Sequence, residues 1–319
     1  GCLVILESTV PVGATEEVVG ALLQLETGLV PGVDFDLCYC PERVLPGNLI
    51  EEIRQNDRVI GGTTPRASAR AAALYSCICD GELLPATVRT AEAVKLIENS
   101  YRDVNIAFAN ELAWLLPQLG VDVWEARDLA NHHPRVNIHM PGSGVGGHCL
   151  PIDPWFLVAA LPEKAQLIRA AREVNDSVPH RIAELLLAQL AGVSRPKVCL
   201  LGLAYKPDVD DCRESPSLEL AALLMERGCE VGAYDPVVTH SALPQASLAE
   251  AAAGAQAAVL LVGHSEFRAL DLALLVNQMT RPWLLDTQDL LSPLSAAAVG
   301  LEVARLGAPE PVSNLEVFR

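Results

Sequence analysis

The sequence has no run of about eighteen or more uncharged apolar residues, which a membrane span needs, and no basic-then-apolar leader opens it. These absences predict neither a transmembrane segment nor a secretory signal. We therefore expect a cytoplasmic protein without a membrane partner.

Positive charge is also scarce. The sequence holds 23 Lys and Arg against 40 Asp and Glu, which gives a formal net charge of −17. Because phosphate backbones bind to basic surfaces, nucleic acid is not an expected partner. An anionic substrate must then be held by a few local arginines and lysines.

No G-x-G-x-x-G segment follows a strand-like run in the first region, although this is the usual signature of a dinucleotide-binding turn. The segment GSGVGG at 142–147 fits the pattern loosely, but no strand precedes it, so we do not interpret it as a phosphate-binding turn. We expect that the first half of a dinucleotide-binding domain is missing from the sequence.

Nine cysteines form an odd, scattered set, which predicts reduced thiols rather than a disulfide framework. Two C-x-C pairs and several histidines near Cys149 raise the alternative of a zinc protein, but their spacings fit no familiar zinc pattern. On a strand such a pair points both thiols to one face, so we expect core packing and no metal. These residues are Cys38 and Cys40, Cys77 and Cys79, and His132, His133, His139 and His148.

Short apolar runs alternate with helical patterns at both ends of the chain. The strand-like runs are 3–6, 35–40 and 57–62 near the start, and 197–205, 257–263 and 282–286 later. This alternation predicts parallel sheets with helices on their faces, and ligands bind such sheets at the carboxyl ends of the strands. Thr9 and Glu42 occupy that edge of the first sheet.

The middle of the chain has a helical pattern. The stretches 89–116 and 163–192 carry apolar residues at helical spacing, and Pro179 should kink the second. A long helix with an apolar face needs a partner, either two domains of its own chain or another subunit. The predicted domains are therefore residues 1–86, 87–192 and 193–319.

Cys149 stands among glycines, with Asp153 four residues further on. A cysteine is often an inert, buried side chain, but a glycine-rich loop offers little mass to bury it. A thiolate presented by backbone amides is a nucleophile, and we favour this interpretation. Asp153 could be the N-cap of a helix, or it could hold a water molecule near the sulfur.

Two further groups of polar residues suit an anionic ligand. Lys95, Asn99 and Arg102 share one helix face, which is either presented to a cleft or a solvated stripe with a link from Lys95 to Glu98. In the loop 206–216, a lysine and an arginine, Lys206 and Arg213, follow a strand. The loop is either an exposed charged turn or a site for the phosphates of a nucleotide.

Several long, ordered segments resemble the UDP-glucose/GDP-mannose dehydrogenase family over nearly the whole chain, to about residue 290. They are STVPVG, YCPERVLPGN, NDRVIGG, RTAEAVKLIENSYRDVNIAFANELA, ANHHPRVNIHMPGSGVGGHCLPIDPWF, AREVND and GLAYKPDVDDCRESP. The resemblance implies an α/β fold in which two Rossmann-like parallel-sheet layers are joined by a central helical domain with a long helix. The truncated first layer would belong to an NAD-binding domain, and the last would bind the UDP-sugar.

The resemblance implies an NAD-dependent, four-electron oxidation of a sugar CH2OH group to a carboxylate. Cys149 would form a thiohemiacetal with the intermediate aldehyde, and a second hydride transfer would give a thioester that water hydrolyses. Glycines would let the sugar lie against the loop, and Asp153 would position or activate the water. Lys95 would act as acid/base or stabilise the alkoxide, with help from Asn99.

The family's motifs assign further roles by position. Thr9 would lie near the cofactor and the catalytic water, Glu42 would join the catalytic set, and Arg213 would reach the cofactor phosphates. The arginine that matches Arg135 comes from a neighbouring subunit in relatives, so a homodimer or higher homo-oligomer is expected. The matching substrate-binding set is Arg43, Val44, Arg102, His133, Arg135, Gly146, Tyr205 and Lys206.

The proline in PERVLPGN stands where UDP-glucose enzymes of the family carry an acid, which favours a UDP-N-acetylhexosamine, with UDP-N-acetyl-D-mannosamine as the best candidate. The segment LLDTQDLL at 284–291 departs from the family because it lacks an arginine after the aspartate. The alternatives are oxidation of UDP-glucose, UDP-N-acetylglucosamine or UDP-N-acetylgalactosamine, and a non-catalytic fragment that binds nucleotide sugars.

Overall fold

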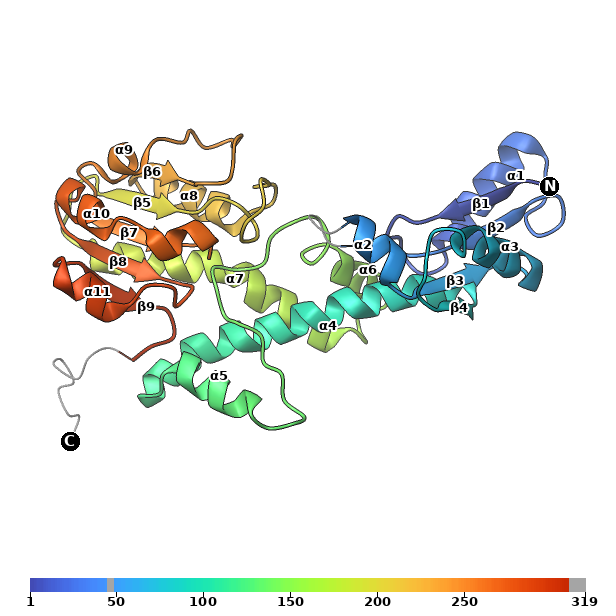
Figure 1. The fold of residues 1–319 in the computed structure, drawn as a ribbon, viewed down its shortest axis with the longest axis horizontal. Helices are drawn as coiled ribbons and strands as arrows, with labels where there is room; N and C mark the ends of the chain where they lie inside the picture. The colour runs from blue at the N-terminus through green and yellow to red at the C-terminus, as the bar shows by residue number, and fades with distance from the viewer. Residues whose placement is uncertain (45–48, 310–319) are drawn as a thin grey trace. The chain divides into compact units, whose positions relative to one another are not determined.

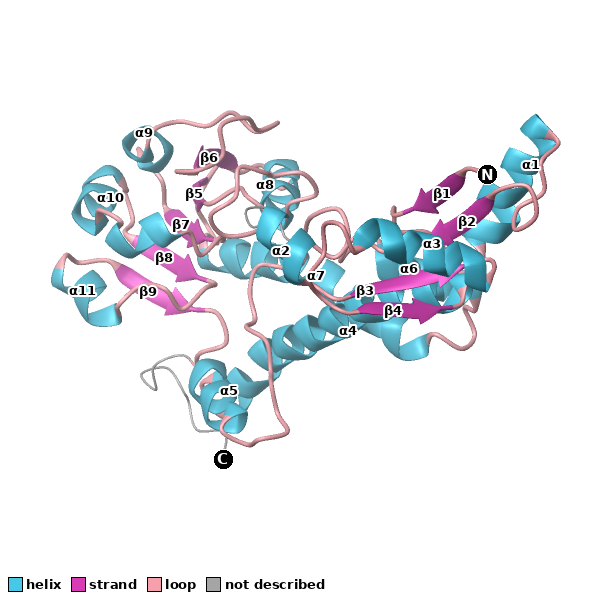
Figure 2. Cartoon of the chain, turned by 45° about the vertical axis from the view of Figure 1, so that its right-hand side comes forward, coloured by secondary structure: helices cyan, strands magenta, loops and turns pink. Residues whose placement is uncertain are grey.

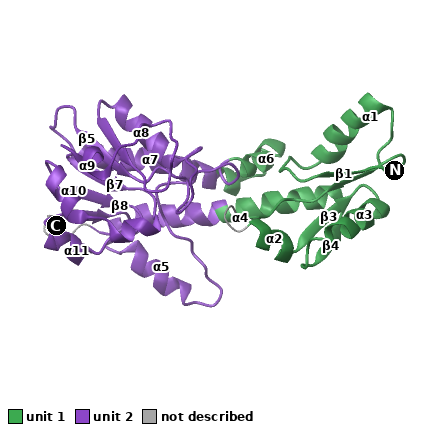
Figure 3. Cartoon of the chain, turned by 45° about the horizontal axis from the view of Figure 1, so that its top comes forward, with its two compact units in different colours: residues 1–102, 152–169 green, residues 103–151, 170–319 purple. Residues whose placement is uncertain are grey.

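The computed structural model describes residues 1–44 and 49–309 (Figure 1). The chain divides into two compact units, which are coloured separately in Figure 3. Unit 1 comprises Gly1–Arg102 and Ile152–Arg169, and unit 2 comprises Asp103–Pro151 and Ala170–Arg319. The two longest helices, α4 (Val88–Leu115) and α7 (Gln166–Gln189), contribute residues to both. The predicted fold class, α/β with sheet layers and a long central helix, is confirmed.

Unit 1 contains a four-stranded sheet in the order β1-β2-β3-β4. Its strands are β1 (Leu3–Leu6), β2 (Asp36–Tyr39), β3 (Arg58–Gly62) and β4 (Leu83–Ala86). The pairs β1–β2 and β3–β4 are parallel, but β2 and β3 are antiparallel, which departs from the predicted parallel sheet. A strand that returns antiparallel needs no crossover over the sheet. Among the described residues between β2 and β3, the one helix is the short α2 (Leu49–Gln55).

The helices of unit 1 follow from local sequence signals. Thr64 caps α3 (Pro65–Tyr75) by accepting a hydrogen bond from the backbone of Ala67, and Pro65 suits the first turn. Ala67, Ala71 and Tyr75 of α3 then pack against Cys38, Cys40 and Ile60 of the sheet. The other helices are η1 (Thr15–Gly20), a π-helix, α1 (Ala21–Thr27), α6 (Asp153–Ala160) and the first part of α4.

Unit 2 contains a five-stranded, fully parallel sheet in the order β6-β5-β7-β8-β9 (Figure 2). Its strands are β5 (Lys197–Leu201), β6 (Glu230–Tyr234), β7 (Ala257–Leu260), β8 (Trp283–Asp286) and β9 (Glu302–Arg305). β5 and β7, two of the three inner strands, read as continuous apolar runs because helices cover both faces of the sheet.

The short helices of unit 2 that the sequence pattern did not predict include α5 (Val123–Asn131) and α11 (Pro293–Ala298). Within residues 291–309, the chain forms α11 and β9. The carbonyls of Leu306 and Gly307 accept hydrogen bonds from the Trp124 indole (2.8 Å) and the Val123 amide (2.9 Å) of α5. The helices are η2 (Leu116–Leu119), α5 (Val123–Asn131), α8 (Pro216–Glu226), α9 (Leu248–Ala252), η3 (Ser265–Ala269), α10 (Leu272–Gln278) and α11 (Pro293–Ala298).

All nine cysteines lie in the described part of the chain, and none forms a disulfide. Cys38 and Cys40 are buried in the core, as predicted. Cys77 and Cys79 are not on a strand: they lie in the turn after α3, with Cys77 exposed and Cys79 buried. Among the described residues, no group of three or more His, Cys, Asp or Glu side chains is placed to hold a metal ion, and no helix is long and apolar enough to cross a membrane.

Candidate active site

One face of α4 brings together several of the predicted catalytic residues in unit 1. The Lys95 ammonium donates to the backbone carbonyl of Glu42 at 2.7 Å. Glu98 does not link to Lys95 as the alternative interpretation supposed; it pairs instead with Arg43, whose guanidinium also donates to the Asp57 carbonyl. The helix face is therefore joined to the segment after β2 and is not a freely solvated stripe.

Asp153 lies beside the same face of α4. Its carboxylate accepts a 2.5 Å hydrogen bond from the Asn99 amide, and both side chains are buried. Burial raises the pKa of Asp153 above its ordinary value, against the opposing effects of the Asn99 hydrogen bond and the Lys95 charge. Asp153 is not the N-cap of α6, because the helix begins with Asp153 itself and the cap position is Ile152. A buried carboxyl with a raised pKa suits general acid/base chemistry.

The loop between β1 and η1 is fixed by a residue that sequence reasoning missed, Glu92 of α4. Its fully buried carboxylate accepts hydrogen bonds from the backbone amides of Gly13 (2.6 Å) and Thr15 (2.8 Å). Thr9 belongs to this loop, so the helix that carries Lys95 also holds the segment that carries Thr9. The sequence did contain a signal for Glu92: it precedes Lys95 by about one helical turn, which places both on the same face of α4.

We expect the substitution Glu92→Gln to lower the free energy of unfolding by about 1–3 kcal/mol, because the amide nitrogen would face a buried backbone N–H that cannot accept its proton. Urea denaturation measures this loss. Glu111 is an exposed residue of the same helix, and Glu111→Gln makes the same chemical change where no amide depends on it. The control should change stability by less than about 0.5 kcal/mol. Equal effects of both substitutions would contradict the capping role.

Cys149 belongs to unit 2 and is exposed, so the interpretation of an inert core thiol is wrong. The glycines before it allow close packing against the chain itself. A Cβ on Gly146 would lie 2.5 Å from the Glu214 carbonyl oxygen, and one on Gly147 would lie 2.9 Å from the Tyr205 ring. Gly147 also has φ of +89°, which other residues rarely adopt. In this structure Tyr205 and Glu214 occupy the space beside these glycines, whereas the prediction placed the sugar there.

A chain of buried polar groups anchors the start of this glycine-rich loop. The Gly142 amide donates to Asn110 (2.9 Å), and the Asn110 amide donates to Asn175 (3.0 Å). Asn175 donates to the Asp103 carboxylate (2.8 Å), which also receives the buried Arg172 guanidinium at 2.5 Å. Sequence reasoning missed these residues, although the segment AREVND contains two of them. The network links α4, α7 and the Cys149 loop within unit 2.

The loop 202–215 after β5 carries the residues predicted to bind phosphates. Arg213 is exposed and pairs with both carboxylate oxygens of Asp211, at 3.0 and 2.8 Å. This pairing holds the pKa of Asp211 well below its ordinary value. The imidazole of His148, next to Cys149, lies 3.5 Å from the same carboxylate. Lys206 makes no hydrogen bond or ion pair with any described residue, so its ammonium is available to a ligand.

The remaining predicted substrate-binding residues are scattered. Arg135 and His133 lie together on an exposed loop after α5, with the Arg135 amide 3.3 Å from the His133 ring. Arg102 is exposed on α4. The amide of Val44 donates to the Glu42 carboxylate, and residues 45–48 of the PERVLPGN motif lie outside the described residues.

Within each unit, the structure thus gathers part of the predicted site. Unit 1 joins Lys95, Asn99, Asp153, Glu42 and Arg43 around α4. Unit 2 joins Cys149, Gly146, Tyr205, Lys206 and Arg213 around two packed loops. The chain passes directly from the Cys149 loop into α6, which begins at Asp153.

Three family models match successive parts of the chain. They describe the NAD binding domain (residues 1–79), the central domain (89–177) and the UDP binding domain (199–293) of the UDP-glucose/GDP-mannose dehydrogenase family. The chain belongs to this family. It is therefore an NAD-dependent nucleotide-sugar dehydrogenase, as the sequence motifs indicated.

Individual relatives support the same assignment. UDP-N-acetyl-D-mannosamine dehydrogenase of Salmonella typhimurium is 47% identical, over 85% of this chain and 69% of the relative. NDP-N-acetyl-D-galactosaminuronic acid dehydrogenase of Ralstonia solanacearum is 43% identical, over 93% of this chain and 72% of the relative. The structure of the UDP-D-ManNAc dehydrogenase from Pyrococcus horikoshii has a TM-score of 0.87 at 42% identity, covering 96% of this chain and 72% of that one.

The residues of unit 1 fit NAD at the carboxyl edge of β1 and β2, where α/β sheets bind nucleotides. Thr9 follows β1, is half-buried, and its hydroxyl makes no hydrogen bond to any described residue, so it can serve a ligand. The amides of Gly13 and Thr15 are already taken by Glu92 and would not bind a cofactor phosphate. Thr9 is thus a candidate contact for the cofactor in this loop.

Proposed function

We propose that the protein oxidises UDP-N-acetyl-D-mannosamine to its uronic acid in two steps through a covalent bond to Cys149. The observation that carries this proposal is the exposure of Cys149 in a loop packed against Tyr205, which belongs to the residues that match the UDP binding domain. A thiol held at a nucleotide-sugar site can react with an aldehyde made there. NAD supplies the chemistry of hydride acceptance in both oxidation steps.

The proposed steps balance as follows. The sugar CH2OH loses a hydride and a proton to become an aldehyde, and the Cys149 sulfur then bonds to the aldehyde carbon, whose oxygen takes up a proton. Loss of a second hydride and that proton gives a thioester. Water cleaves the C–S bond, so that one CH2OH group, two NAD+ and one water yield a carboxylate, two NADH and three protons.

Residues of unit 1 would handle the protons and the developing charge. Lys95 would stabilise the alkoxide and exchange its proton, since its ammonium is fixed by the Glu42 carbonyl. Asn99 would hold the oxyanion or the water, and Asp153, with its raised pKa, would accept a proton from that water. Thr9 would lie near the cofactor and the catalytic water, and Glu42 would be a further member of the catalytic set.

The substrate would be held by residues from several segments. Tyr205 and Lys206 would bind the nucleotide. Arg213 would break its ion pair with Asp211 and bind the cofactor phosphates instead. In a homodimer or higher homo-oligomer, Arg135 would act in the active site of the neighbouring subunit. Within one chain, we expect domain boundaries at 86/87 and 192/193. We expect these reactions in the cytoplasm. The other substrate-binding residues in the proposal are Arg43, Val44, Arg102, His133 and Gly146.

The full-length protein should be assayed with a panel of UDP-sugars while NADH is followed at 340 nm, its usual absorbance maximum. We expect two NADH per sugar consumed, with the highest kcat/KM for UDP-N-acetyl-D-mannosamine. Preference for UDP-N-acetylgalactosamine would instead favour the sugar series named for the Ralstonia relative, an NDP-N-acetyl-D-galactosaminuronic acid dehydrogenase that is 43% identical. Binding of UDP-sugars without any NADH formation would instead support a non-catalytic binding protein.

A further inference from the structure

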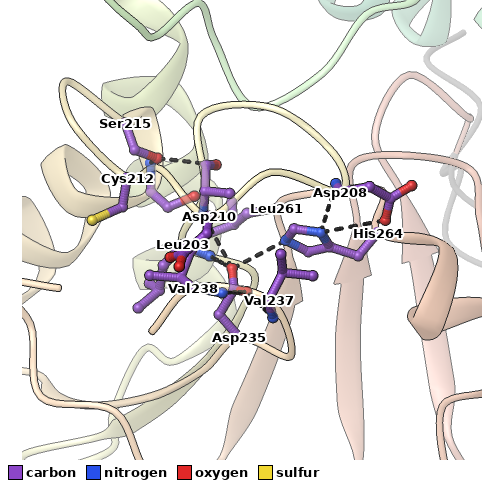
Figure 4. Close-up of polar contacts among 12 residues, drawn as sticks. Leu203, Asp208, Asp210, Cys212, Ser215, Asp235, Val237, Val238, Leu261 and His264 are labelled. Carbon is purple, nitrogen blue, oxygen red and sulfur yellow. Dashed lines mark hydrogen bonds and ion pairs between the residues drawn. The ribbon is translucent and has the colours of Figure 1, made fainter. Parts of the chain in front are cut away.

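A fully buried histidine of unit 2, His264, contacts the backbone of Asp208, in the loop that also carries Tyr205 and Lys206. Figure 4 shows His264 between Asp208 and Asp235. His264 follows β7, and its imidazole lies between two aspartates. The Nε2 atom is 3.1 Å from the Asp235 carboxylate, and the Nδ1 atom is 2.9 Å from the backbone nitrogen of Asp208. No step of the proposed reaction uses this group, so its burial requires a separate explanation.

Asp235 is an ionised anchor at the end of β6. One oxygen accepts the backbone amides of Val237 and Val238, both at 2.8 Å, and the other accepts those of Leu203 (2.6 Å) and Ala204 (3.1 Å). Burial alone would raise the pKa of this carboxyl, but His264 and the backbone amides hold it below its ordinary value. Asp235 therefore fixes the first residues of the loop after β5.

The contacts of His264 define its tautomer. A backbone N–H can only donate, so Nδ1 must accept from Asp208 and carries no proton. The proton is then on Nε2, which donates to Asp235. The Asp208 carboxylate is farther from Nδ1, at 3.7 Å, and accepts instead from the amide and hydroxyl of Ser265, at 2.8 and 3.0 Å. The neutral imidazole thus links the Asp235 carboxylate to the Asp208 backbone, with one hydrogen bond to each.

Asp208 needs this hold because its φ is +60°, a left-handed conformation that costs energy for a residue with a Cβ. The loop after β5 is consequently tied at both ends, at Leu203 and Ala204 by Asp235 and at Asp208 by His264. Tyr205 and Lys206 lie between the two ties. β5 and β7 are also the neighbouring strands where the chain order of the sheet reverses, which is where α/β sheets bind ligands.

We infer that His264 is a positioning residue for nucleotide binding: it holds the Asp208 backbone so that Lys206 and Tyr205 are presented in the binding conformation before the ligand arrives. The inference rests on the proposed binding of a UDP-sugar by this loop. A loop ordered in advance loses less conformational entropy on binding. His264 itself touches neither sugar nor cofactor in this scheme.

Two substitutions separate the two contacts of the imidazole. In His264→Asn, the amide oxygen can take the place of Nδ1 and accept from Asp208, while the contact with Asp235 is lost. In His264→Gln, the amide can take the place of Nε2 and donate to Asp235, while the Asp208 N–H loses its acceptor. Both shrink the buried ring, so a purely structural role predicts similar effects of the two.

Isothermal titration of the full-length protein with UDP is the test. We expect His264→Gln to weaken UDP binding about tenfold and to raise KM for the UDP-sugar similarly with little change in kcat, whereas His264→Asn stays within about threefold of the parent. The Asp208 amide should exchange with deuterium faster in His264→Gln than in His264→Asn. The inference would be overturned if His264→Gln left UDP affinity unchanged, or if both substitutions weakened it equally. Either outcome would leave the proposed function intact. A parent protein that does not bind UDP would overturn the proposed function and this inference with it.

Discussion

The substitution Cys149→Ser is expected to reduce formation of the uronic acid by about a thousandfold or more, the scale seen when a covalent catalyst loses its nucleophile. A serine hydroxyl is a far weaker nucleophile than a thiolate at neutral pH, so the aldehyde would not be trapped. The first hydride transfer does not need the sulfur. Single-turnover experiments should therefore still show NADH from the first step, while the carboxylate product, measured by mass spectrometry, is almost absent.

Cys77→Ser is the matched control, because Cys77 is another exposed thiol, placed after α3 in unit 1. It should leave both oxidation steps unchanged. Labelling with iodoacetamide gives an independent readout: Cys2, Cys77 and Cys149 are all exposed, so exposure alone predicts that all three react, but only Cys149 should be protected by a UDP-sugar. Carboxylate formation at the parent rate in Cys149→Ser would refute the covalent route.

Sequence patterns predicted the fold where burial is uniform along an element. The apolar runs that became β5 and β7 are covered on both faces, and a strand in that position must be apolar throughout. The antiparallel entry of β3 was not predictable in this way, because the direction of a strand leaves no mark on its hydrophobic pattern. Residues after 290 were also missed, since β9 is a short edge strand of mixed polarity.

The candidate site was predicted where its chemistry requires an unusual residue in an unusual setting, as with Cys149 among glycines. The residues that hold the site were missed, because a buried Glu92 or His264 looks like any other polar residue in the sequence. Their partners are backbone amides of segments distant along the chain. Such contacts exist only after folding, so the identity of the residue carries little information about them.

The second large effect is expected at Arg172, whose buried guanidinium pairs with the buried carboxylate of Asp103. Arg172→Met should lower the free energy of unfolding by about 3–5 kcal/mol, because it leaves a carboxylate in the interior without its counter-charge. Urea denaturation would measure the loss. The network that continues through Asn175 and Asn110 to Gly142 predicts that the Cys149 loop also becomes more accessible to proteolysis.

The pH dependence of the Arg172→Met variant separates the charge effect from a packing effect. Burial already raises the pKa of Asp103, against the attraction of Arg172, and removing the arginine should raise it further. A carboxyl whose pKa is higher in the folded than in the unfolded state favours folding at low pH, and this contribution is lost as the pH rises through the folded value. The variant should therefore lose stability relative to the parent as the pH rises above the ordinary aspartate range and through the raised pKa of Asp103. Adding Asp103→Asn removes the stranded charge and keeps an oxygen for Asn175, so the double variant should recover most of the loss and its pH dependence. A deficit that is independent of pH and is not recovered would show that Arg172 acts by filling space, because an uncompensated charge must respond to both changes.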